Sequence, residues 1–177
     1  MDKEYFENNE ERDWELLQAF NEKTGLFDEL TKANEKHYTD ASGYTVNKLG
    51  DIRKWNIELK YRNLNLLDDG RISGATERGS FFDETIFIES HKIADMLLDN
   101  INGLEPLYIN FLNDGKVIVY NLTKLTLRPK KTGNMNIKSK GYGKFEVAKR
   151  QGLYIKDAAI FGNDGKLIKK AGEDWKK

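Results

Sequence analysis

The sequence predicts a single α/β domain, built on a mixed β-sheet whose central antiparallel hairpin is flanked by helices. Three observations predict this class. The chain has 177 residues, which is enough for one domain with a sizeable core and too few for two comfortable ones. Apolar residues recur at helical spacing in two segments, near the N-terminus and around residue 95. The strand-like runs elsewhere are bounded by Gly, Asn or Asp turns and do not alternate regularly with helices, so βαβ repeats are not expected.

The first elements along the chain are a helix and a hairpin. Residues 14–20 carry apolar side chains at helical spacing, and Gly25 is placed to end that helix. The stretches HYTDASGYTVN (37–47) and IRKWNIELKYRN (52–63) have the alternation of strands, and Gly50 between them supports a tight turn. We therefore expect these two stretches to pair as an antiparallel hairpin.

The later elements follow from the same signals. The polar stretch LLDDGRISGATERGS (66–80) is expected to be a loop, because it is rich in Gly, Asp and Ser. The run ETIFIES (84–90) is typical of a buried strand, and HKIADMLLDNI (91–101) has helical periodicity. The turn sequence Asn-Asp-Gly occurs at 113–115 and again at 163–165, and each occurrence predicts a further hairpin.

Charge is balanced over the whole chain but uneven along it. With 29 basic and 29 acidic residues the formal net charge is zero, so no overall field indicates a nucleic-acid or membrane partner. Residues 1–40 hold 12 acidic and 5 basic residues, whereas residues 121–150 hold 9 basic and 1 acidic residue. Within the second region, residues 126–150 have several glycines and few apolar residues, which predicts a basic loop or arm.

Composition excludes several kinds of chemistry. The chain has no cysteine, so a disulfide, a thiolate zinc site and thiol catalysis are all excluded. We find no recognisable serine–histidine motif and no glycine-rich phosphate loop. The acidic N-terminus does not resemble a secretory signal, and no run of 18 apolar residues occurs, so we expect a cytoplasmic protein without a membrane partner.

A carboxylate and an ammonium lie close together in the second strand of the predicted hairpin. Because side chains alternate along a strand, Glu58 and Lys60 project to the same side, about 7 Å apart, while Leu59 points to the opposite layer. A Mg²⁺-dependent phosphodiesterase uses such groups, since carboxylates hold the hard cation and a lysine positions the attacking water. The alternative interpretation is an amphipathic strand whose polar face lies in water.

A metal site of this kind needs a second carboxylate, and Asp40 is the better candidate. Asp51 lies on the same strand as Glu58, about 23 Å away and with the wrong parity, so it cannot share an ion. If the hairpin turns at Leu49 and Gly50, the numbers of cross-strand partners sum to about 99. Asp40 then lies beside Leu59, between the positions of Glu58 and Lys60, unless a bulge shifts the register.

This order of elements resembles the PD-(D/E)xK nuclease superfamily, which has the restriction-endonuclease-like fold and includes small resolvase-like and phage-type nucleases. The resemblance rests on a helix, an Asp in TDAS, Glu-x-Lys in IELK, and the strand and helix of IFIESHKIADML, from about residue 10 to about residue 125. It implies a Mg²⁺- or Mn²⁺-dependent deoxyribonuclease, more an endonuclease than an exonuclease. Asp40 and Glu58 would hold the ion and Lys60 would serve the water. Thr39 stands where the family name has proline.

The resemblance implies further site residues. Many members carry an acidic residue on the first helix, which maps to Asp13, with Glu10 as a substitute, and a lysine after the fourth strand, which maps to Lys92. If Lys60 is catalytic, we expect its ammonium to pair with Glu58 or Asp40 when no metal is bound.

The predicted partner is DNA. Its expected contacts are Lys92 and Arg62, together with basic residues of the arm: Lys130, Lys131, Lys138, Lys140 and Lys144. The arm is equally typical of a solvated loop. Small nucleases that cut both strands often act as homodimers, although no interface is recognisable in the sequence. Two further hypotheses stay open: a non-catalytic nucleic-acid- or protein-binding module of the same fold, and an accessory protein of a phage or mobile element.

Overall fold

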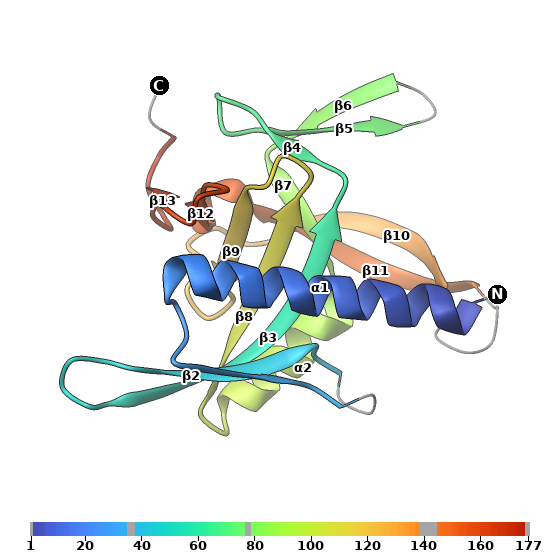
Figure 1. The fold of residues 1–177 in the computed structure, drawn as a ribbon. Helices are drawn as coiled ribbons and strands as arrows, with labels where there is room; N and C mark the ends of the chain where they lie inside the picture. The colour runs from blue at the N-terminus through green and yellow to red at the C-terminus, as the bar shows by residue number, and fades with distance from the viewer. Residues whose placement is uncertain (1, 35–37, 77–78, 139–144, 176–177) are drawn as a thin grey trace.

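The computed structural model describes residues 2–34, 38–76, 79–138 and 145–175. Within these residues the chain forms two α-helices, a seven-stranded mixed sheet and two three-stranded sheets (Figure 1). The helices are α1 (Asp2–Thr24) and α2 (Ser90–Asn100). The large sheet has the order β1 (Glu29–Lys32), β2 (Ala41–Val46), β3 (Ile52–Arg62), β8 (Leu104–Leu112), β9 (Val117–Asn121), β12 (Ala159–Phe161) and β13 (Leu167–Lys169).

The two smaller sheets are built from the remaining strands. One has the order β10 (Lys130–Lys138), β11 (Phe145–Tyr154) and β7 (Thr85–Glu89), and the other has the order β4 (Asn65–Leu66), β5 (Ile72–Thr76) and β6 (Gly79–Asp83). A 3₁₀ turn, η1 (Ile155–Asp157), connects β11 to β12. In the large sheet β3 and β8 are parallel, and the other pairs are antiparallel. The predicted α/β class with a mixed sheet is therefore confirmed.

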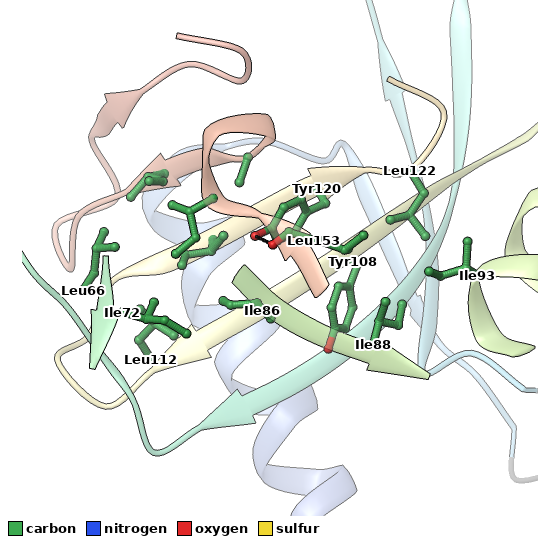
Figure 2. Packing of buried hydrophobic residues seen from close by; sticks show 14 of the residues in the cluster. Leu66, Ile72, Ile86, Ile88, Ile93, Tyr108, Leu112, Tyr120, Leu122 and Leu153 are labelled. Carbon is green, nitrogen blue, oxygen red and sulfur yellow. Dashed lines mark hydrogen bonds between the residues drawn. The ribbon is translucent and has the colours of Figure 1, made fainter. Parts of the chain in front are cut away.

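Each face of the large sheet carries its own hydrophobic core. Helix α1 crosses one face (Figure 1), where Leu17 and Phe20 pack with β3 residues such as Ile57 and Leu59. The opposite face is covered by β7, β11 and α2. Figure 2 shows this second cluster, in which Tyr108 lies beside Ile88 of β7 and Tyr120 beside Leu153 of β11. No helix in the described parts of the chain is apolar over a length that would cross a bilayer.

Most of the predicted elements are present. Helix α1 ends at Thr24, and Gly25 follows with a φ of 59°, a conformation that glycine adopts without a steric penalty. The β2–β3 and β8–β9 hairpins both form, and α2 begins one residue before its predicted start. The predicted hairpin at 163–165 forms from the short strands β12 and β13, and η1 separates β12 from β11.

Two predicted loops are wrong. The stretch 66–80 contains β5, which pairs with β4 and β6, and Gly74 allows this because a β-carbon there would meet Phe81 at 2.6 Å and Leu64 at 2.7 Å. The stretch 126–150 contains β10 and most of β11 rather than a loop or arm. Pairing with β7 satisfies the backbone groups of β11, and a bulge at Gly133, with φ of 82°, lets β10 follow.

Candidate metal centre

Glu58 lies in the middle of β3 and is buried, with 4% of its surface exposed. Its neighbours on both sides in sequence, Ile57 and Leu59, are also buried, because α1 covers their face of the sheet. Glu58 projects to the other face, which α2 and β7 cover. The strand is thus buried on both faces at this point, and the interpretation that Glu58 belongs to a solvated polar face is wrong.

Asp40 lies beside Glu58, just before β2 begins. The Asp40 N–H donates to the Ile57 carbonyl (3.0 Å), and Asp40 Oδ2 accepts from the N–H of Leu59 (2.7 Å). The β2–β3 register pairs Ala41 with Ile57, so partner numbers sum to 98, one less than predicted. Asp40 precedes this ladder and bonds to the residues on both sides of Glu58. The hairpin therefore brings the two predicted carboxylates together.

Lys92, in the first turn of α2, forms an ion pair with Glu58. Its Nζ donates to Glu58 Oε1, and the Lys92 side chain is 27% exposed whereas that of Glu58 is 5% exposed. The other carboxylate oxygen, Glu58 Oε2, is buried and has no hydrogen-bond partner within the described residues. The expectation that Lys60 would pair with one of the carboxylates is wrong, since Lys92, brought in by α2, occupies that place.

Lys60 is exposed and lies two residues beyond Glu58 on the same face of β3. It makes no ion pair with any residue in the described ranges, yet its charge acts on Glu58 and lowers the pKa of that carboxyl group. Lys60 is therefore near the carboxylates and open to solvent, which is the placement that a group acting on a water molecule requires.

The charges of this cluster shift one another's protonation. Burial, followed by the charge of Asp40, raises the pKa of Glu58 to about 8, against the opposing effect of Lys92. Burial opposes the charge on Lys92, but the carboxylates of Glu58 and Asp40 outweigh it, and the pKa of Lys92 is raised. The buried carboxylate of Glu58 and the half-buried carboxylate of Asp40 thus act on one ammonium.

Asp40 and Glu58 are the residues of the cluster that could hold a cation. Glu58 Oε2 is buried and accepts no hydrogen bond within the described residues. Carboxylate oxygens are the ligands that Mg²⁺ and Mn²⁺ prefer. Within the described residues no group of three or more acidic, histidine or cysteine side chains is placed to hold a metal. Asp13 is not brought to the pair: it lies on α1 and forms an ion pair with Arg12 (2.8 Å).

Residues that the sequence analysis did not single out support the cluster on either side. Asn56 is 1% exposed, and its Nδ2 donates to Tyr38 Oη (2.8 Å) and to Asp99 Oδ2 (2.9 Å) on α2. The fully buried Asn110 accepts from Arg62 Nε through Oδ1 (3.1 Å), and its Nδ2 lacks a partner within the described residues. Asn56 could have been predicted from the sequence, because it lies two residues before Glu58 and therefore on the same face of the strand.

The predicted DNA contacts have different surroundings. Arg62 donates to the Phe87 carbonyl and Tyr108 Oη as well as to Asn110, so its contacts are internal. Lys130 and Lys131 are exposed on β10. Lys138 ends that strand, whereas Lys140 and Lys144 lie outside the described residues.

The β10–β11 ribbon reaches the edge of the cluster of Asp40, Glu58 and Lys92. Arg150 of β11 pairs in register with Glu89, the residue before α2, and its guanidinium lies 4.5 Å from the centre of the Phe87 ring. Lys92 follows three residues after Glu89. The basic strands and the carboxylate pair therefore meet at the N-terminal end of α2.

Comparisons with known proteins give no match to this chain, whether with protein-family models, curated protein sequences or solved structures.

Proposed function

We propose that the chain is a divalent-metal-dependent nuclease that hydrolyses DNA phosphodiester bonds, as an endonuclease of the restriction-endonuclease-like kind. The observation that carries the proposal is the pairing of Asp40 with Glu58, whose buried Oε2 has no donor within the described residues. A buried acceptor without a partner costs free energy of folding. In this proposal a bound divalent cation is the partner of Glu58 Oε2.

The residues around the pair have distinct tasks in this proposal. Asp40 Oδ2 is fixed by the Leu59 N–H and Glu58 Oε1 by Lys92, so each carboxylate is oriented before an ion arrives. A bound Mg²⁺ would supply a Lewis acid for the scissile phosphate. The exposed Lys60 would orient a water molecule, whose oxygen forms the new bond to phosphorus while the bond to the leaving oxygen breaks.

The ribbon of β10 and β11 supplies a surface for the nucleic acid. Lys130, Lys131 and Lys149 are exposed on these strands, and Arg150 lies where β11 meets the start of α2. Lysines on an edge strand offer phosphate contacts without a sequence code, which suits a duplex or a single strand. A homodimer would let one such site act on each strand of a duplex.

A second function is favoured by a specific observation. Only two carboxylates meet at the centre, and Lys92 already neutralises one of them; within the described residues no third metal-ligating group joins them. A non-catalytic DNA- or protein-binding module of the same fold would have such a reduced centre. It is the function that remains if the protein binds DNA and does not cut it.

A cleavage assay separates the two functions. Wild-type protein is incubated with supercoiled plasmid and with single-stranded DNA in Mg²⁺ or Mn²⁺, beside Lys60→Met and Glu58→Gln. We expect metal-dependent cleavage by wild type and a loss of about two or more decades in each variant. Lys48→Met, an exposed lysine in the β2–β3 turn, should cut as wild type does. No cleavage by wild type, or unchanged cleavage by Lys60→Met, would sink the nuclease proposal.

A further inference from the structure

We infer that Lys92 is an internal counter-ion of the Asp40–Glu58 pair, which a divalent cation must displace from Glu58 when it binds. This inference rests on the proposed function, because it concerns the same carboxylates. It gives Lys92 a task that differs from a simple DNA contact: the ammonium holds the centre in its metal-free form and sets the metal concentration at which the centre fills.

One ammonium contacts Glu58 and acts through its charge on Asp40. Lys92 Nζ donates directly to Glu58 Oε1, and the charge of Asp40 also acts on Lys92. A cation that enters between Asp40 and Glu58 would add two positive charges within a few ångströms of a third. Because the Glu58 carboxylate is buried, charges beside it are weakly screened, and metal and ammonium compete for the same pair of carboxylates.

Lys92 is the partner that can move. Glu58 lies on a central strand that is paired on both sides, and its side chain is 5% exposed. The Lys92 side chain is 27% exposed, on the first turn of α2, and its long apolar stem can turn towards solvent while the backbone stays in place. Glu89, the N-cap residue of α2, also acts on Lys92 through its charge.

Removal of the Lys92 charge should therefore raise metal affinity. We expect Lys92→Met to bind Mn²⁺ at least about tenfold more tightly than wild type at about pH 8. Removal of the Lys92 charge also raises the affinity of Glu58 for a proton. A proton has half the charge of the metal ion, so the affinity for the metal ion rises more. Lys48→Met is the matched control: the exposed Lys48 ammonium lies in the β2–β3 turn and is screened by water, and we expect less than about a threefold change.

The experiment is a Mn²⁺ titration of wild type, Lys92→Met and Lys48→Met, by isothermal calorimetry and by the loss of the free-ion electron paramagnetic resonance signal. Circular dichroism checks that each variant is folded. Tighter binding by Lys92→Met alone supports the inference. If wild type binds Mn²⁺ and Lys92→Met binds no more tightly, the inference is overturned and the metal site stands. If none of the three binds Mn²⁺, the metal site of the proposed function fails, and the inference fails with it.

A measurement on wild type covers the case in which Lys92→Met does not fold, since it leaves a buried carboxylate without its cation. Lysine side chains are labelled with ¹³C at Cε, and the Lys92 signal is assigned by its absence from Lys92→Arg. On saturation with Mg²⁺ this signal should move towards the position of exposed lysines such as Lys48. A Lys92 signal that stays in place while Mg²⁺ is present at saturating concentration overturns the inference.

Discussion

At the scale of single residues, Glu58 shows how a polar strand position becomes a candidate site. Burial of a carboxylate is unfavourable for stability, and an apolar side chain would pack there at lower cost. The pair with Asp40 followed from the sequence, because the strand period of two and the turn at Gly50 fix which residues face one another. The ion pair of Lys92 with Glu58 could not be predicted from the sequence. Lys92 lies 34 residues further along the chain and reaches Glu58 only because α2 packs on the sheet.

The raised pKa of Glu58 predicts a pH dependence of stability. The ordinary value is 4.5, and in the folded protein it is about 8, mainly because of burial. The folded state then binds this proton more tightly than the unfolded chain, so the contribution to the free energy of unfolding is present below about pH 4.5 and falls as the pH rises towards about 8. The slope is at most about 1.4 kcal/mol per pH unit for one proton.

Urea unfolding of wild type and Glu58→Gln between about pH 5 and about pH 8 measures this effect. Glutamine resembles the protonated side chain at every pH, so the stability of the variant relative to wild type should increase with pH. A difference that stays constant across this range would show that Glu58 titrates as it does in the unfolded chain.

At the scale of elements, the errors of sequence interpretation fall where strands are short or weakly apolar. The stretches around Gly74 and Gly133 have the composition of loops, yet both form strands, because each glycine permits a close contact or a bulge that another residue would block. The longer hairpins were predicted because their apolar alternation and their turns, at Gly50 and at Asn-Asp-Gly 113–115, are local signals. Pairing with a strand that is distant in sequence, such as β7 with β11, leaves no local signal.

The C-terminal hairpin depends on a buried lysine. Lys169 on β13 is 6% exposed, and burial lowers its pKa. Its Nζ donates to four backbone carbonyls, those of Lys156 (2.8 Å), Ala158 (3.0 Å), Lys170 (3.1 Å) and Ile155 (3.4 Å). We predict that Lys169→Met lowers the free energy of unfolding by about 2–4 kcal/mol, because the carbonyls lose their donor.

The matched control is Lys166→Met, in the turn of the same hairpin. The Lys166 side chain is 86% exposed and pairs with Asp164, so its replacement should change the free energy of unfolding by less than about 0.5 kcal/mol. Chemical denaturation of both variants checks the prediction, and equal effects of the two substitutions would contradict it.

At the scale of the whole molecule, the large sheet separates the two covering layers. Helix α1 packs on the face of Ile57 and Leu59, while Glu58 projects to the face of α2. This arrangement explains why Asp13 pairs with its neighbour Arg12 rather than with the carboxylates. The sequence predicted which residues share a strand face, but not which layer covers that face, because the parallel pairing of β3 with β8 depends on the whole crossover between them.

The uneven charge of the chain leads to a prediction for the whole protein. If the β10–β11 ribbon binds DNA, replacement of Lys130, Lys131 and Lys149 by glutamine should weaken binding to any sequence, because exposed lysines contact phosphates rather than bases. Each lost phosphate contact lowers the slope of log K against log salt by about 0.9 for duplex DNA, so the triple variant should lose between about 1 and about 3.

Fluorescence anisotropy with a labelled duplex, titrated at several salt concentrations with EDTA present to prevent cleavage, gives both affinity and slope. The control variant carries the same change in net charge at exposed lysines elsewhere: Lys48, Lys166 and Lys170 to glutamine. Because electrostatic binding depends on where the charges lie and not only on their sum, the control should keep the wild-type slope. If both triple variants lose the same slope, the effect comes from net charge alone, and the ribbon is not the DNA-binding surface.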